Sequence, residues 1–141
     1  MRDILQKLNY RNQGRIAILN AEKKFLRMIR SGRPELKIDT EIDPRFPYEF
    51  MIIFVRFLAE VDEIAPKAIH NLVSDGVLWF AYPNRKSSAR IASDLDNAHG
   101  WEILLERGFD RVRQVIIDEN WSAIRFRNIR YIKSPKYQLH S

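Results

Sequence analysis

The chain of 141 residues has no cysteine, few glycines and no long apolar run. The missing cysteine excludes disulfides, thiolate nucleophiles and zinc sites with cysteine ligands, and it fits a reducing compartment. The longest apolar runs, residues 50–55 and 77–82, stop at Arg56 and Pro83, well short of the about 18 to 20 residues of a membrane helix. The start of the chain also lacks the continuous apolar stretch of a signal peptide. We therefore expect a cytoplasmic protein with no membrane partner.

The composition is that of a folded protein, with 45% hydrophobic and 11% aromatic residues. The length suits one domain with a single core. We expect one α/β domain over residues 1–141, in which residues 1–13 are a lead-in and residues 135–141 a loose tail.

Positive charge gathers at the two ends of the chain. The net charge is +6, and residues 1–33 hold nine cations and two anions, while residues 109–141 hold seven and three. Residues 34–66 are acidic, with three cations and eight anions. Basic ends favour a polyanionic partner, self-association into a homo-oligomer, or packing of the ends near the acidic segment. No nucleic-acid motif accompanies the charge, so nucleic acid is the weaker alternative, although it is not excluded.

Hydrophobic periodicity predicts the order strand, helix, strand, strand, helix, strand, helix and a final hairpin. The expected strands are residues 15–20, 36–42, 50–55, 77–82, 112–117 and 123–132, and the expected helices are residues 22–30, 58–73 and 101–107. Because proline disrupts a helix interior, Pro66 predicts that the second helix is divided in two. Ser74 to Gly76 are expected to cap that helix and turn the chain into the next strand. The order predicts a mainly parallel sheet between two layers of helices, ending in an antiparallel hairpin.

Ligands of such sheets bind beyond the carboxyl ends of the strands. That edge should hold Asn20, Arg56 and the loop of residues 83–88. The loop offers an amide, two cations and two hydroxyls as ligand-binding candidates, namely Asn84, Arg85, Lys86, Ser87 and Ser88. These groups could hold an anion if a helix follows. The favoured alternative is a solvated loop in which Ser87 or Ser88 caps a helix.

The first strand leads into residues 19–23, which contain no glycine. A side chain on every residue opposes the close approach of backbone to a dinucleotide or S-adenosylmethionine, so we expect no cofactor. Asn20 is expected either to cap the following helix or to contact a ligand, and the cap is the favoured alternative.

The histidines lack the spacing of helical metal ligands, so no metal site is predicted. His99 lies near the polar loop and could act as an acid or base with Asp94 or Asp118. A structural hydrogen bond is the favoured alternative for His99, and conformation alone explains an acidic residue in a hairpin turn.

The second half of the chain resembles an uncharacterised bacterial family of unknown function whose members look like trimmed class I methyltransferases. The resemblance covers about residues 74–133, and it rests on Gly76-Val77-Leu78-Trp79, Tyr82-Pro83, Lys86-Ser87-Ser88, Ser93-Asp94, His99-Gly100-Trp101-Glu102 and the run from Val112 to Arg127. It implies a Rossmann-like methyltransferase architecture with one antiparallel strand. It implies no activity, and it marks Lys86 to Ser88, Asp94, His99, Asp118 and Trp121 as candidate site residues.

Three functional hypotheses follow. The first is a non-catalytic binding or scaffolding module that holds an anionic group at the strand-exit edge. The second is an enzyme that uses His99 with Asp118 or Asp94 on a phosphorylated or nucleotide substrate. The third is association with nucleic acid through the basic ends.

Overall fold

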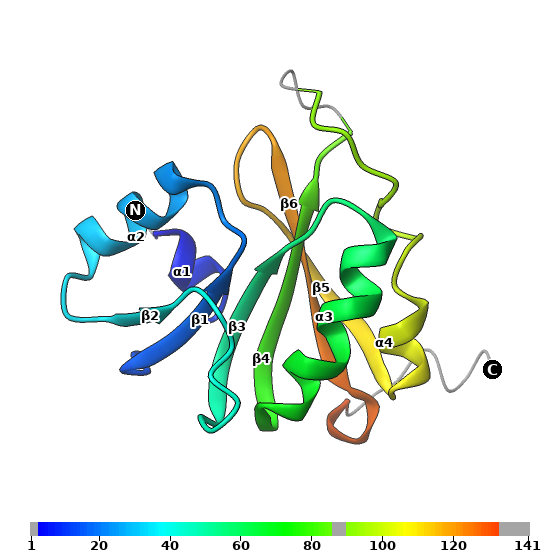
Figure 1. Cartoon of the computed structure of the whole chain (residues 1–141), viewed down its shortest axis with the longest axis horizontal. Coiled ribbons are helices and arrows are strands. Elements are labelled where there is room, and N and C mark those ends of the chain that lie inside the picture. Colours follow the sequence, from blue (N-terminus) through cyan, green and yellow to red (C-terminus); the bar gives the residue numbers. More distant parts are fainter. Residues whose placement is uncertain (1–2, 86–89, 133–141) are drawn as a thin grey trace.

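The computed structural model describes residues 3–85 and 90–132. Its centre is a six-stranded sheet in the order β2-β1-β3-β4-β6-β5 (Figure 1). The strands are β1 (Arg15–Leu19), β2 (Lys37–Asp39), β3 (Tyr48–Phe54), β4 (Leu72–Pro83), β5 (Phe109–Ile116) and β6 (Trp121–Asn128). The first four pair in parallel, whereas β6 is antiparallel to both β4 and β5. The predicted α/β fold, a mainly parallel sheet with a final antiparallel hairpin, is confirmed.

Helices cover both faces of the sheet. They are α1 (Ile4–Lys7), α2 (Lys23–Gly32), α3 (Leu58–His70) and α4 (Glu102–Glu106), and a short 3₁₀ turn, η1 (Ile129–Tyr131), follows β6. Figure 1 shows α1 and α2 beside β1 and β2, and α3 and α4 on the side of β4 and β5. None of the described helices has the length and apolar character that a membrane span requires.

The sheet separates two hydrophobic cores. Leu78 and Phe80 of β4 face the core that α3 and α4 close, while Val77 and Trp79 face the core that α1 and α2 close. Residues 50–54 of β3 and 77–82 of β4 are buried on both faces, which explains why these parts of the sequence are continuous apolar runs. Trp79 also donates its indole N–H to the carbonyl of Leu8, at 2.7 Å, so the lead-in is fastened to the centre of the sheet.

The described part of the lead-in is therefore packed into the core of the domain. It contains α1, whose N-cap Asp3 accepts a hydrogen bond from the amide of Gln6. Leu5 and Leu8 are fully buried against the sheet. A helix of four residues is too short to show a helical pattern of hydrophobic residues in the sequence. Its stability comes from this tertiary packing.

Two predictions about the middle of the chain are wrong. The helix is not divided at Pro66, since α3 continues through it to His70, and Val61, Ala65 and Ala68 anchor it on both sides of the proline. Ser74 to Gly76 do not form a turn before the strand, because β4 already begins at Leu72, which pairs with Tyr48. The backbone does depart from regular strand geometry here, but it does so inside β4, where Asp75 has a φ of 57°.

Several strand boundaries also differ from the prediction by one to four residues, and three of them matter for the shape of the sheet. The second strand ends at Asp39 rather than residue 42, β5 begins at Phe109 rather than residue 112, and β6 ends at Asn128. After β2 the chain turns back, and Arg15 binds both Asp39 and Asp43. This pair of contacts fixes the turn in place of further strand pairing.

Candidate functional site

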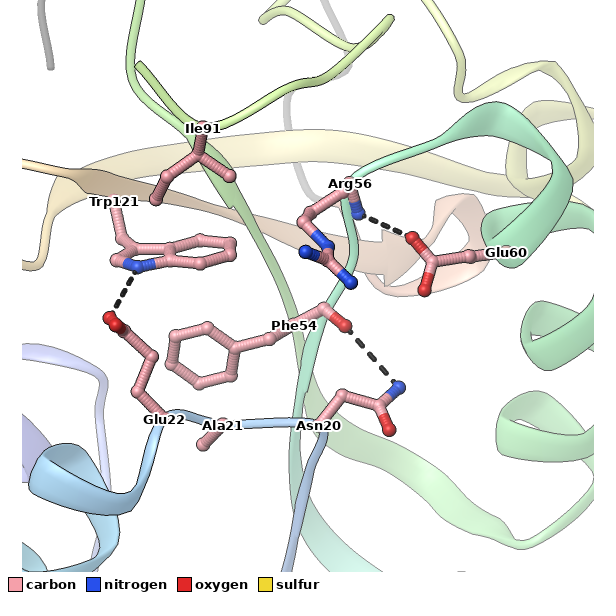
Figure 2. Close-up of a pocket in the computed structure, with 8 residues that line it drawn as sticks. All are labelled: Asn20, Ala21, Glu22, Phe54, Arg56, Glu60, Ile91 and Trp121. Carbon is pink, nitrogen blue, oxygen red and sulfur yellow. Dashed lines mark hydrogen bonds between the residues drawn. The ribbon is translucent and has the colours of Figure 1, made fainter. Parts of the chain in front are cut away.

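The carboxyl ends of β1 and β3 border a cavity of about 460 Å³ (Figure 2). Its walls come from four separate parts of the chain: the β1–α2 loop, the end of β3 with the start of α3, the segment after residue 90, and the start of β6. The lining residues are Asn20, Ala21, Glu22, Phe54, Arg56, Glu60, Ile91 and Trp121. The cavity therefore lies at the edge where the sequence predicts a ligand site.

Asn20 makes the turn out of β1 without a glycine. Its φ is 61°, in the left-handed region that asparagine tolerates better than most residues. Its side-chain amide donates to the carbonyl of Phe54, at 3.4 Å, and so links the ends of β1 and β3. The predicted cap is wrong, because the N-cap of α2 is Glu22. Asn20 instead shapes the floor of the cavity.

One wall of the cavity is aromatic and fixed by a hydrogen bond. Trp121, at the start of β6, donates its indole N–H to Glu22 Oε1, at 2.8 Å. The Trp121 ring meets Phe54 edge to face, with 5.1 Å between the ring centres, and Phe54 meets Phe25 of α2 in the same way. Figure 2 shows the rings of Trp121 and Phe54 side by side at the cavity. These contacts tie the hairpin to α2 and make this wall rigid.

Arg56 supplies the cavity with a positive charge. Glu60 Oε1 accepts hydrogen bonds from the backbone amides of Arg56 and Phe57, at 2.8 and 3.0 Å, and holds the chain where β3 passes into α3. The Arg56 side chain is exposed, and Figure 2 shows it extending into the space between Phe54 and Ile91. No residue in the described part of the chain forms an ion pair or hydrogen bond with its guanidinium.

The loop after β4 starts at the same edge, but its first cation already has a partner. Arg85 Nη2 binds Asp96 Oδ2 at 2.7 Å, and the Arg85 side chain is 78% exposed. The amide of Asn84 donates to the carbonyl of Asn120, at 2.7 Å. Lys86, Ser87 and Ser88, which the sequence analysis also assigned to the anion site, lie outside the described residues.

His99 pairs with a carboxylate that the sequence analysis did not select. Its Nδ1 lies 2.9 Å from both carboxylate oxygens of Asp96, and its side chain is 75% exposed. The hydrogen bond from His99 is the main cause that lowers the pKa of Asp96 from 3.8 to about 2, and the amide of Ala98 contributes. Asp96 thus joins Arg85 to His99.

The two carboxylates named as partners of His99 hold backbone amides instead. Asp94 Oδ1 accepts from the amide of Leu58, at 2.7 Å, in the first turn of α3. Asp118 Oδ1 accepts from the amides of Asn120 and Trp121, at 2.8 and 2.9 Å, and so closes the hairpin turn. Neither forms a hydrogen bond with His99 within the described residues.

Asp39 stands where a dinucleotide-binding fold places an acidic residue for the ribose, about 20 residues beyond the first strand exit. Here its carboxylate binds Arg15 Nε, at 2.8 Å, and accepts a hydrogen bond from the Tyr48 hydroxyl. Arg15 and Tyr48 begin β1 and β3. The carboxylate is therefore engaged by residues that begin β1 and β3, and Asp39 does not line the cavity.

The sequence analysis placed Asn20 and Arg56 at this edge and included Trp121 among the site residues, and all three line one cavity. It missed the other five lining residues, which are Ala21, Glu22, Phe54, Glu60 and Ile91. The only available signal was the position of Phe54 and Glu22 beside predicted strand ends. Over residues 3–85 and 90–132, no three histidine or acidic side chains form a cluster that could hold a metal ion.

No family model and no curated protein matches this sequence. Solved structures do match the fold. A methyltransferase dependent on S-adenosylmethionine from Aquifex aeolicus has a TM-score of 0.59 at 7% identity, over 89% of this chain and 87% of that chain. A putative type 11 methyltransferase from Sulfolobus solfataricus has 0.52 at 8%, over 98% and 95%. A chain of a fibrillarin/Nop5p complex has 0.51 at 11%, over 84% and 74%. At these identities the likeness shows the fold alone, which is the Rossmann-like fold of class I S-adenosylmethionine-dependent methyltransferases.

Proposed function

We propose that this protein is a non-catalytic binding module that holds a small anionic ligand in the cavity at the strand-exit edge. The observation that carries the proposal is the guanidinium of Arg56, which extends into the cavity and has no ion-pair partner among the described residues (Figure 2). An arginine can bind a carboxylate or phosphate through two parallel hydrogen bonds. The anionic group of the ligand would bind there.

The rest of the cavity supports a ligand with an apolar body. Its volume of about 460 Å³ lies within the usual range of small-molecule sites. Phe54, Ile91 and Trp121 provide apolar walls, so an anionic head and an apolar body would have separate places. Ile91 belongs to the segment that follows the loop of Lys86, Ser87 and Ser88, and these three residues stay candidates for additional contacts to the anion.

The engagement of the two cavity carboxylates supports binding over acid–base chemistry. Glu22 holds the indole of Trp121, and Glu60 holds two backbone amides. A carboxylate that maintains the shape of the site would disrupt that shape if it took up a proton in each turnover. The lining residues thus favour a preformed and rigid pocket.

Thermal melting with a panel of nucleotides, phosphorylated metabolites and S-adenosylmethionine tests this proposal. A ligand at 100 times its Kd should stabilise the fold by about 2.7 kcal/mol and raise Tm. Arg56→Gln should remove that shift. Arg107→Gln is the matched control, because Arg107 is exposed and precedes β5 at the opposite end of the sheet. The proposal is wrong if no compound in the panel raises Tm, or if Arg56→Gln responds as the wild type does.

A second candidate function is an enzyme in which His99 acts as an acid or base. The contact between His99 and Asp96 favours it, because a carboxylate on Nδ1 orients the ring and leaves Nε2 for a substrate. Asp94 and Asp118 remain the partners that the sequence suggests. If the panel yields a compound that the protein converts, His99→Ala should abolish turnover while the far-ultraviolet circular dichroism spectrum stays that of the folded protein, whereas retained turnover rejects the role of His99.

A further inference from the structure

The sheet face that α1 and α2 cover changes character along β6. Side chains of a strand alternate between the two faces, and Trp121 and Ala123 of β6 belong to the core beneath α1 and α2. The next two positions on this face are Arg125 and Arg127. Figure 1 shows that α1 and α2 lie beside β1 and β2, several strands away from β6. The far half of β6 on this face therefore carries arginines where the near half carries core residues.

Two more arginines come close to these two. Arg113 of the edge strand β5 is directly opposite Arg125 in the antiparallel register. Arg11 lies in the segment between α1 and β1. Burial is the main cause that lowers the pKa of Arg125, and the charges of Arg127, Arg113 and Arg11 lower it further. We call these four residues the arginine face.

The charge of the arginine face is poorly compensated. Arg127 binds both carboxylate oxygens of Asp75, each at 2.7 Å. Arg125 Nε is buried and has no hydrogen-bond partner among the described residues. Like charges directly across a strand pair destabilise a sheet, so the Arg113 and Arg125 pair costs free energy in the unbound protein. A polyanion laid over the face would relieve that cost.

We propose that the arginine face, Arg11, Arg113, Arg125 and Arg127, binds the phosphate backbone of a nucleic acid strand. Arginine matches phosphate geometry, and each phosphate that it neutralises releases counterions. The fold is what creates this surface, because Arg11 comes from one basic end of the chain and the other three come from the other end. Val115, two residues beyond Arg113 along β5, packs against the core on this face, and because an aliphatic side chain does not stack on bases, the contact should show little base preference.

Fluorescence anisotropy with labelled single-stranded RNA and DNA oligonucleotides of mixed sequence tests the inference on the full chain. Three arginines without a carboxylate partner predict a plot of log K against log salt with a slope of about −2. Arg113→Gln and Arg125→Gln should each weaken binding several-fold at low salt and make the slope shallower by about 0.7. Arg113 is exposed on an edge strand, so its replacement should not lower Tm.

Lys67→Gln is the matched control, because it removes the same charge from α3 on the opposite face of the sheet. It should bind as the wild type does. Arg56→Gln should also bind normally, which keeps this inference separate from the small-ligand site. The inference is overturned if neither oligonucleotide binds, if Lys67→Gln loses as much affinity as Arg113→Gln, or if vesicles of anionic phospholipid bind while oligonucleotides do not.

Discussion

Asp96 is the residue that organises the segment before α4. Its carboxylate accepts hydrogen bonds from the amides of Ala98 and His99, both at 2.8 Å, and it pairs with Arg85 as well. Its carbonyl accepts the indole N–H of Trp101, at 2.7 Å. One residue thus connects the loop after β4, through its carboxylate, to a tryptophan in the core, through its backbone carbonyl.

The lowered pKa of Asp96 predicts a pH dependence of stability. Because the folded state holds this carboxylate ionised down to a pKa of about 2, against 3.8 for the ordinary group, its contribution is complete above pH 3.8 and is lost as the pH falls towards 2. Asp96→Asn should be less stable than the wild type at neutral pH, and the difference should shrink across this window. Urea unfolding at a series of pH values measures it. Asp62→Asn, an exposed change on α3, should leave the profile unaltered, and a parallel pH profile for Asp96→Asn would contradict the assignment.

The shape of the cavity depends on the backbone conformation of Asn20. A left-handed φ costs a residue with a Cβ about 1 to 2 kcal/mol, while glycine adopts it freely. Because asparagine tolerates this conformation better than alanine does, Asn20→Ala should lower the free energy of unfolding by about 1 kcal/mol, and Asn20→Gly should lower it less. Chemical denaturation compares the two variants. An equal loss in both would mean that the hydrogen bond to Phe54, and not the backbone, is what matters.

At the scale of elements, α3 shows how tertiary packing can override a local signal. Proline removes one backbone hydrogen bond and crowds the preceding turn, yet α3 runs from Leu58 to His70. The helix tolerates Pro66 because the buried side chains of Val61, Ala65 and Ala68 hold it against the sheet. Because this packing involves residues that are distant in sequence, the sequence alone does not show that the helix continues through Pro66.

Pro66→Ala should accordingly stabilise the protein. The change restores a helix hydrogen bond and removes the steric conflict, which together cost about 3 kcal/mol in a helix interior, and the greater freedom of the unfolded chain offsets about 1 kcal/mol of this. We expect a gain of about 1 to 2 kcal/mol in urea unfolding. Ala59→Pro, in the first turn of α3, provides the contrast, since proline is tolerated there. A loss of stability in Pro66→Ala would show that the proline shapes the packing of α3.

At the scale of the whole molecule, the two cores share one sheet. Trp79 lies in the core beneath α1 and α2, and Trp101 lies in the core beneath α3 and α4. β4 contributes alternate side chains to both cores. The loss of either core would therefore disturb the strand against which the other core packs. The lead-in belongs to this unit through Leu5, Leu8 and the bond from Trp79 to Leu8.

The molecule should therefore unfold in one cooperative transition. The fluorescence of Trp101→Phe comes from Trp79 and Trp121 and reports on the α1 and α2 side, whereas that of the double variant Trp79→Phe/Trp121→Phe comes from Trp101 alone and reports on the α3 and α4 side. Within each variant, the fluorescence midpoint in urea should coincide with the far-ultraviolet circular dichroism midpoint. A fluorescence transition that precedes the loss of secondary structure in either variant would show that one core opens independently.

The sequence by itself determined the order of the elements from β1 to β6, the parallel centre of the sheet and the edge at which the parallel strands end. Continuous apolar runs such as residues 50–55 identify strands buried on both faces, and local hydrogen-bonding habits identify the turn at Asp118. These features follow from the period of hydrophobic side chains, which a sequence shows directly.

Only the tertiary structure decided which side chains meet. Glu22 binds Trp121, Asp96 binds both Arg85 and His99, and Arg11 joins arginines from the far end of the chain. Such contacts depend on the crossing of strands that are distant in sequence, and several side chains of suitable charge compete for each partner. The sequence offers all of these pairings, and the close packing of one sheet between two layers of helices selects among them.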